Sequence, residues 1–549
     1  MNLQAEASIT QNPTLASKII RTKFNMSFGH KTTGNAGKLI PIFCEKFMPG
    51  DTFKINTRSL IRMTTPLVAV MDNAYIDIAF FAVPERLIWE HAREFRGENT
   101  TTAWEQTVEY EKPQIKAPTS GWNYKTVADH LGIRPGISNI EIDALPFRAM
   151  CLIWNEFYRD ENLQNPIIID KGDSTVTGSN GTNYLTDSIL GGELLPVNKL
   201  RDYFTSCLPA PQKGPDVLLP LGQTAPVYTY AEDNNTLNNI GLRMQQLNGK
   251  YTEQGRNMVT SNANADGLVR TGQSYNYAEG GAELQPANLK ADLTEATAAT
   301  INSLYQAIAI QSLYQTDARG GTRYREIILN HFGVRTSDAT IQVPEYLGGK
   351  RIPINMNQVV QTSQSTETSP QGTVTAFSLT ADEHESISKS FEEWGYVLGF
   401  AYIRNENTYQ QGIERKWFEK RRFDEYWPAL ANLGEQPVLN REIFAQGTDA
   451  DKEVFGYMEA WASYRYKCNQ VSGEFRSEYP QSKAYYHYAD NYSSQPILGP
   501  DWIQSDKTNF DRTLAVTSQV SDQFDMDFWF DWTAVREMPM YSVPGIQSL

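Results

Sequence analysis

Two segments in which every second residue is apolar most limit what this chain can fold into. In residues 52–63, apolar and small side chains share one face, while mainly basic and amide side chains share the other, with Leu60 as the exception. In residues 523–532, five large apolar side chains alternate with three aspartates and Trp529. Because successive side chains of a strand point to opposite faces of a sheet, each segment predicts a strand with one buried face.

Further strands and helices are expected at wide intervals along the 549 residues. Residues 74–83 are apolar on both faces, which is typical of a central or covered strand, and residues 396–404 are apolar and aromatic. Apolar residues at helical spacing predict helices at 143–164, 289–314 and 323–332; the first has Asp143 as its N-cap, and the second is broken by residues 317–322. Widely spaced strands with such insertions favour an elaborated β-sandwich over an alternating βαβ sheet.

The charge of the chain is unevenly distributed. Its net charge is -15, which argues against a general nucleic-acid-binding protein. Residues 1–40 nevertheless have a net charge of +4, because Glu6 is their only acid and their cations are Lys18, Arg21, Lys23, Lys31 and Lys38. We expect these residues to form an extended basic arm, which either contacts nucleic acid or packs under neighbouring subunits.

Residues 224–290 differ in composition from the rest of the chain. They contain ten Asn and seven Gly but no Phe, Trp or Cys, so they cannot build a large core of their own. Long excursions of this kind are usually functional, and we expect a surface insertion here.

A second basic segment lies in the C-terminal half, within residues 414–422. It alternates cations with aromatic rings, and its candidate nucleic-acid contacts are Arg415, Lys416, Trp417, Lys420, Arg421 and Arg422. Cations neutralise phosphates and rings stack on bases, so the pattern suits single-stranded nucleic acid. The alternative is a solvated face whose cations pair with Glu414, Glu419, Asp424 and Glu425.

No catalytic motif is found in the sequence. There is no phosphate-binding loop, no dinucleotide fingerprint and no metalloprotease motif, and the six histidines and four cysteines lack metal-ligand spacing. Asp525 and Asp527 are close enough on one strand face for glycoside hydrolysis or Ca²⁺ binding, but they can equally keep a solvent face polar. We therefore expect no catalytic residue, no metal and no cofactor. Two functional classes stay open at this point: a β-sandwich carbohydrate-binding protein or glycosidase, and a receptor-binding spike.

Several blocks of sequence resemble one virus family. The first runs through residues 28–42, 48–53, 65–74 and 80–89 and includes Gly34-Asn35-Ala36-Gly37 and Met48-Pro49-Gly50-Asp51. Others lie at 202–215, 317–328, 331–334, 344–349 and 540–546. Together they resemble the major capsid proteins of microviruses, and specifically those of the gokushovirus group of small single-stranded DNA bacteriophages. The likeness covers nearly the whole chain.

The resemblance implies a specific fold and function. The fold is an eight-stranded antiparallel jelly roll, a mainly β sandwich, with long loop and helical insertions in one capsid domain over residues 1–549. Identical subunits form a T=1 icosahedral shell around circular single-stranded DNA, assembled in the host bacterial cytoplasm, and the chain is a structural virion component, not an enzyme. In the gokushovirus branch a large insertion forms protrusions at the threefold axes, for which residues 224–290 are the candidate. Further expected partners are a small internal DNA-binding protein, a minor vertex or pilot protein, and a host-cell surface receptor.

Overall fold

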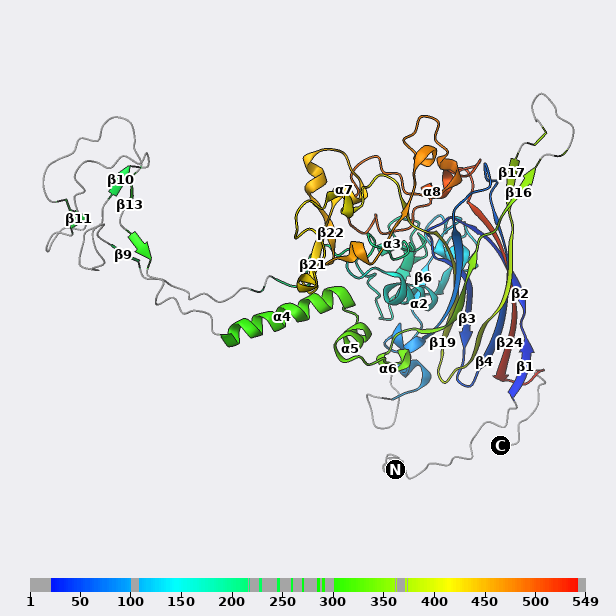
Figure 1. The fold of residues 1–549 in the computed structure, drawn as a ribbon. Helices are drawn as coiled ribbons and strands as arrows, with labels where there is room; N and C mark the ends of the chain where they lie inside the picture. Colours follow the sequence, from blue (N-terminus) through cyan, green and yellow to red (C-terminus); the bar gives the residue numbers. More distant parts are fainter. Residues whose placement is uncertain are drawn as a thin grey trace. The chain divides into compact units, whose positions relative to one another are not determined.

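The computed structural model describes residues 21–99, 108–215, 217, 301–360, 362, 371, 372 and 374–541, together with short strands between residues 227 and 291. The chain divides into two compact units. The sandwich unit comprises Met1–Pro211 and Thr316–Leu549, and the insertion unit comprises Gln212–Gln315. Figure 1 labels several elements of both units.

The first sheet of the sandwich unit has the order β1-β24-β4-β18, and β2 also pairs with β24. We call it the charged sheet. All of its pairs are antiparallel, and β24 lies between the N-terminal strands and β4. Its strands are β1 (Arg21–Asn25), β2 (Phe28–Gly34), β4 (Thr52–Met63), β18 (Thr380–Ser390) and β24 (Phe524–Glu537).

The second sheet, which we call the covered sheet, has the order β15-β5-β19-β3 and is also antiparallel. Nearly every residue of β5 and β19 is buried, as expected for the middle strands of a sheet with both faces covered. The strands are β3 (Ile40–Phe47), β5 (Ala74–Pro84), β15 (Glu345–Pro353) and β19 (Gly395–Asn405). The structure thus confirms the mainly β sandwich.

Aromatic rings fill the space between the two sheets. The Phe43 ring of β3 meets the Phe530 and Trp532 rings of β24 edge-on, with centroids 5.3 and 5.5 Å apart. Trp532 also meets Phe53 of β4 at 5.2 Å. Such edge-to-face contacts add to the free energy gained by burying apolar area.

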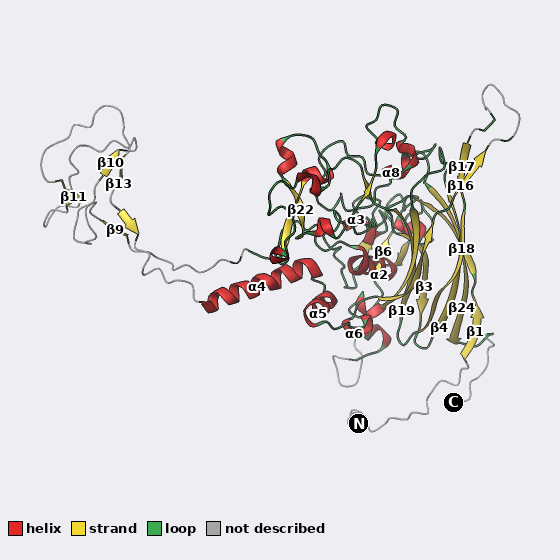
Figure 2. Cartoon of the chain, in the orientation of Figure 1, coloured by secondary structure: helices red, strands yellow, loops and turns green. Residues whose placement is uncertain are grey.

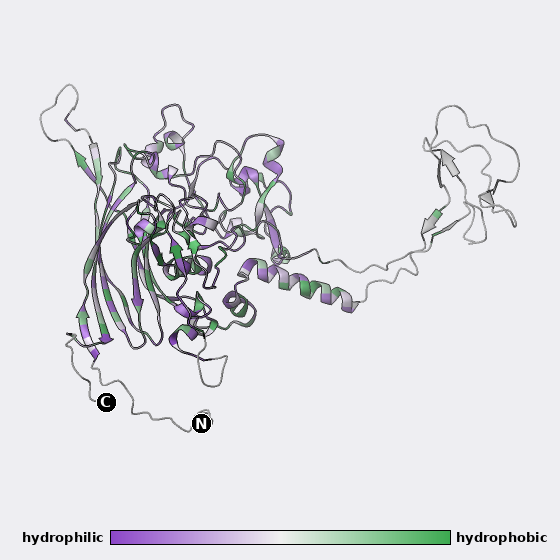
Figure 3. Cartoon of the chain, turned by 180° about the vertical axis from the view of Figure 1, so that it is seen from behind, coloured by the Kyte–Doolittle hydropathy of each residue, from purple (hydrophilic) through white to green (hydrophobic). Residues whose placement is uncertain are grey.

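The outer faces of the two sheets differ. Helix α2 (Leu145–Ile153) and the π turn Trp154–Tyr158 cover the covered sheet, and the Phe157 and Phe81 centroids lie 4.8 Å apart. On the charged sheet, Leu60 of β4 is exposed on the same face as the cations of that strand. The alternation of the strand therefore places this side chain in solvent although it is apolar. Figure 2 shows α2 on the side of β19 away from the charged sheet, and Figure 3 shows hydrophilic and hydrophobic residues alternating along the strands.

The remaining elements of the sandwich unit are short and lie in its long connections. The helices are α1 (Val127–His130), α3 (Tyr184–Asp187), α5 (Tyr324–Phe332), α6 (Asp338–Ile341), α7 (Asn440–Ile443) and α8 (Thr508–Asp511). The strands are β6 (Gln114–Lys116), β7 (Glu141–Asp143), β8 (Val176–Thr177), β16 (Met356–Val360), β17 (Val374–Ser378), β20 (Thr408–Tyr409), β21 (Glu435–Leu439), β22 (Val454–Glu459) and β23 (Asn469–Gln470). In the part of the chain that the structure describes, no helix is long and apolar enough to cross a membrane.

The described strands of the insertion unit form three two-stranded antiparallel pairs. These are β9 (Val227–Thr229) with β14 (Leu289–Ala291), β10 (Met244–Gln246) with β13 (Leu284–Pro286), and β11 (Met258–Val259) with β12 (Val269–Arg270). Helix α4 (Ile301–Gly320) begins in this unit and ends in the sandwich unit.

Two predicted helices have different bounds in the structure. The helix predicted at 143–164 ends with the π turn, because Asp160 then accepts the backbone N–H groups of Asn162 and Leu163 and closes a tight turn. Its N-cap residue is Ala144, although the Asp143 carboxylate does accept the Leu145 N–H. The helix predicted at 289–314 is wrong at both ends, since Leu289–Ala291 is a strand and α4 continues to Gly320.

Candidate functional site

A second hydrophobic cluster holds the basic and aromatic loop in place. It forms where residues near Tyr203 and Tyr409 meet hairpin β21–β22 and helix α7. The Phe204 ring meets the Tyr409 ring edge-on, with centroids 4.7 Å apart. Strand β20 pairs in parallel with β23, so the residues after β20 lie beside residues 463–470. The 3-10 turn Arg415–Phe418 begins six positions after Tyr409, the last residue of β20.

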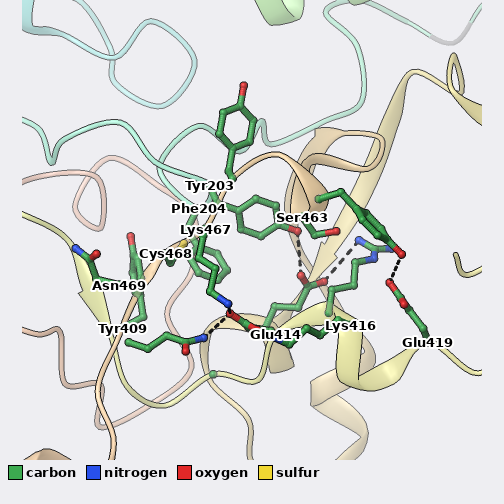
Figure 4. A pocket seen from close by; sticks show the side chains of 16 residues that line it. Tyr203, Phe204, Tyr409, Glu414, Lys416, Glu419, Ser463, Lys467, Cys468 and Asn469 are labelled. Atoms are coloured by element: carbon green, nitrogen blue, oxygen red, sulfur yellow. Dashed lines mark hydrogen bonds and ion pairs between the residues drawn. The ribbon is translucent and has the colours of Figure 1, made fainter. Parts of the chain in front are cut away.

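A pocket of about 210 Å³ opens beside this turn (Figure 4). Its walls combine aromatic rings with three cations and three carboxylates. The lining residues are Tyr203, Phe204, Tyr409, Gly412, Glu414, Arg415, Lys416, Glu419, Glu442, Ser463, Tyr464, Tyr466, Lys467, Cys468, Asn469 and Gln470.

The carboxylate of Glu442 lies at the buried side of the pocket. It accepts the Tyr203 hydroxyl at 2.9 Å and lies 3.7 Å from the Arg415 guanidinium. Burial raises the pKa of Glu442, although the Leu439 N–H and Arg415 oppose the change. Burial, together with the nearby Glu442, also raises the pKa of the Tyr203 phenol. Arg415 is thus committed to a partner inside the chain.

Glu414 binds the other two pocket cations. Its carboxylate lies 2.8 Å from the Lys467 ammonium, forms a second ion pair with Lys416, and accepts a hydrogen bond from the Gln470 amide. Hydrogen bonds from Lys416 and Lys467 lower the pKa of Glu414. The pocket therefore presents compensated charge and exposed ring faces, which suits an amphipathic contact better than a free phosphate.

The following residues are arranged differently. Asp424 accepts the backbone N–H groups of Lys420 and Arg421, which fixes the turn but does not pair their side chains. Among the described residues, no ion pair joins Lys420, Arg421 or Arg422 to a carboxylate, and all three are exposed. The Arg422 guanidinium lies over the Trp427 ring at 4.8 Å. We call Lys420, Arg421 and Arg422 the cationic triplet.

Exposed rings flank the cationic triplet. Trp417 and Phe423 are each 71% exposed, and Tyr426 and Trp427 are also exposed. The Lys416 ammonium lies 5.4 Å from the Trp417 centroid, which leaves the other ring face open. Unpaired cations beside open ring faces are the components of a single-stranded nucleic-acid surface. The solvated-face alternative thus fits Arg415 and Lys416, which are paired with carboxylates. Contact of the cationic triplet with nucleic acid stays a prediction.

Two of the described cations of the N-terminal segment form ion pairs with acids of their own chain. Lys31 lies 3.3 Å from Asp527, and Lys38 lies 2.5 Å from Glu193. Arg21 and Lys23 belong to β1, where Arg21 faces Glu537 across the strands, and Lys18 lies outside the described residues. Residues 21–34 are therefore ordered by pairing with β24.

The outer face of the charged sheet carries a ladder of opposite charges. Arg58 lies 3.0 Å from Glu383 and 3.1 Å from Asp531, and Lys54 lies 3.7 Å from Glu385. Asp525 and Asp527 belong to the same open face, as the solvent-face interpretation predicts. Among the described residues, no group of three His, Cys, Asp or Glu side chains has the geometry of a metal site.

The four cysteines are free thiols, and Cys151 and Cys207 are buried. Burial, together with nearby carboxylates, raises the pKa of Cys468, which lines the pocket, to about 12. Its thiol is therefore protonated at neutral pH and is a weak nucleophile.

Sequence reasoning missed several residues of the pocket. Tyr203, Glu442 and the nearby Tyr464 and Lys467 come from three separate segments, and no spacing in the sequence joins them. Only residues 464–467 carry a signal of their own, since aromatic and basic side chains alternate there.

The chain matches known capsid proteins over nearly its whole length. A family model described as capsid protein (F protein) matches residues 13–546. A capsid protein VP1 of Spiroplasma virus 4 is 42% identical over 526 residues, which cover 95% of this chain and 94% of the relative. A capsid protein VP1 of Bdellovibrio phage phiMH2K is 42% identical over 528 residues, covering 96% and 95%. A capsid protein VP1 of Chlamydia phage 1 is 36% identical over 581 residues, covering 97% and 96%.

Proposed function

Because this chain belongs to the phage capsid protein (F protein) family, we propose that it is the major capsid protein of a T=1 icosahedral shell that encloses circular single-stranded DNA. The match over residues 13–546 carries this conclusion, since it includes both sheets and the long connections. Capsid proteins act through contacts between identical subunits, so the biological unit is a virion component built from many copies. Assembly takes place in the host bacterial cytoplasm.

The sandwich unit is proposed to be a jelly roll. Its order supports this: the chain passes from β2 to β3, β4 and β5 by crossing between the two sheets at each step. After β15 it crosses again through β18, β19 and β24. Eight strands are thereby divided as β2-β24-β4-β18 and β15-β5-β19-β3, which is the arrangement of two interlocked Greek keys.

In this proposal the whole chain forms one capsid domain with a large insertion. The insertion unit, Gln212–Gln315, contains the compositionally distinct residues 224–290. We assign these residues to a threefold protrusion that serves host attachment. Antibody labelling of residues 224–290 on purified particles would test the assignment, because the label should decorate the outer surface at the threefold axes.

The DNA contact is proposed to involve the cationic triplet and Trp417. The triplet has no carboxylate partner among the described residues, whereas Lys31, Lys38, Arg415 and Lys416 each have one. Phosphate contacts release counterions and stacking on rings tolerates any base, so this contact needs no sequence preference. The N-terminal arm is a second candidate contact. A small internal DNA-binding protein and a minor vertex or pilot protein are the proposed further partners.

Electron microscopy of the purified full chain tests the central proposal. We expect uniform small isometric particles, which carry protected single-stranded DNA when they are purified from a host that supplies the genome. A protein that stays monomeric at every concentration, ionic strength and pH tried contradicts the proposal.

A further inference from the structure

Helix α4 contains a long uncharged segment that starts at its first residue. From Ile301 to Thr316 the sequence contains no Asp, Glu, Lys or Arg, and the first charged side chain is Asp317. A helix exposed to water normally carries charged side chains on its open face. This segment therefore has the composition of a helix that is covered by protein.

One side of the segment is covered by its own unit. Gln311 donates a hydrogen bond to Gln212, and the Tyr314 carbonyl accepts the Lys213 N–H at 3.3 Å. A Cβ atom on Gly214 would lie 3.2 Å from the Tyr314 ring, so the chain runs directly over that ring. Residues 212–214 thus pack on the side of α4 that carries Gln311 and Tyr314.

Among the exposed side chains of α4, Ile310 and Leu313 lie elsewhere around the helix, while Leu304, Tyr305, Ile308, Ala309 and Ser312 lie together on one side. Their spacing of i, i+1, i+4, i+5 and i+8 places them in one stripe along the helix. All five are exposed, with Tyr305 at 66% and Ile308 at 55%. Figure 3 shows hydrophobic residues along this helix. We call these five residues the α4 stripe.

We propose that the α4 stripe packs against the same stripe on α4 of a second copy of this chain. The inference rests on the proposed self-assembly of the capsid protein, which brings copies of α4 into one particle. When the same stripe meets itself about a twofold axis, residue i contacts residue j of the copy and j contacts i, and only residues beside the axis meet their own copies, so a stripe of like charges would repel itself. The α4 stripe has no charge, and it combines large side chains with Ala309 and Ser312, which let helices approach closely.

Other occupants fit the stripe less well. Nucleic acid needs cations, and the stripe has none. A charged partner protein would bury its own charges against a stripe that has no charged side chain to pair with them. A second uncharged helix is the partner whose chemistry matches.

Disulfide trapping tests the contact in assembled particles of the full chain. We expect Ile308→Cys, at the middle of the stripe and so beside the twofold axis, to give covalent dimers on mild oxidation, seen on a non-reducing gel. The matched control is Gln306→Cys, which is exposed on the same helix but lies outside the stripe. Wild-type particles control for the four native cysteines. No dimer from Ile308→Cys, or equal amounts from both variants, overturns the proposal.

A charge placed in the stripe gives a second readout. We expect Ile308→Glu to lower the yield of particles at least 10-fold, while Gln306→Glu leaves the yield unchanged. Circular dichroism of the unassembled Ile308→Glu chain should match wild type, because the side chain is exposed in the subunit. Normal assembly of Ile308→Glu overturns the stripe contact alone, whereas a wild-type chain that forms no particles overturns the proposed function as well.

Discussion

The cationic triplet makes a quantitative prediction about the salt dependence of DNA binding. In the triple variant K420Q/R421Q/R422Q, three exposed cations without a carboxylate partner among the described residues are removed. If each neutralises one phosphate, the slope of log K against log salt for single strands becomes less steep by about 2. When the salt concentration rises from 50 to 200 mM, the fold-decrease in affinity should then be about 20 times smaller for the variant than for the wild type.

Fluorescence anisotropy of the unassembled full chain with a labelled single-stranded oligodeoxynucleotide measures this slope. The matched control is K31Q/K54Q/R58Q, which removes the same charge from cations that pair with carboxylates on the charged sheet. Because those cations already have partners, we expect the control slope to change by less than one. Equal slopes for the wild type and the triplet variant would refute the assignment. A larger change of slope in the control than in the triplet variant would indicate that the DNA contact lies on the charged sheet.

Four further outcomes follow from the described contacts. Trp417→Ala should weaken oligonucleotide binding by about 1–3 kcal/mol with little change in the salt slope, because stacking is lost but no charge is; an unchanged affinity contradicts the stacking role. Phe530→Ala should lower the free energy of unfolding by about 3–5 kcal/mol, measured by urea denaturation of the unassembled chain, because a fully buried ring is removed. Lys199→Met should cost about 3–5 kcal/mol at neutral pH, since it leaves Asp490, 2.7 Å away, buried without its cation. Burial alone would raise the pKa of Asp490, but Lys199 and hydrogen bonds hold this pKa below its ordinary value. In the wild type, the stability that Asp490 contributes is therefore present above about pH 4 and is lost as the pH falls through the lowered pKa. The stability difference between Lys199→Met and the wild type should shrink on acidification, and a pH-independent difference would contradict this coupling.

Alternation along the chain was enough to predict several strands. The segment 52–63 coincides with β4, and 74–83 differs from β5 by one residue. Residues 523–532 mark only part of β24, which continues to Glu537 because β1 pairs with its end. The outward position of Leu60 illustrates that the pairing of a whole strand outweighs the preference of one side chain.

Helix bounds were less predictable because distant residues decide them. Leu289–Ala291 pairs with Val227–Thr229, so cross-strand hydrogen bonds override a helical composition. Helix α4 runs past Asp317 because Arg319 pairs with Glu435 and extends the last turn, and Gly321 with a φ of 96° ends it. Neither contact is visible within the local window of sequence.

The sequence was enough to locate the candidate site but not to tell its paired cations from its unpaired ones. Interleaved cations and rings mark residues 414–422, yet which cations are paired depends on distant residues. Glu442 binds Arg415 from 27 positions away, and Glu193 binds Lys38 from 155 positions away. The net charge of the N-terminal segment therefore overstates the number of its cations that are available to phosphate.

The position of β24 affects how the protein is made. The last strand of the chain lies between β2 and β4, and Lys31 meets Asp527 across 496 residues of sequence. Synthesis must therefore pass residue 537 before β24 can pair with β2 and β4 in the charged sheet, and such distant pairing is slow to form. Products that terminate before Phe524 lack the strand that joins the N-terminal strands to β4, so they cannot form a complete charged sheet.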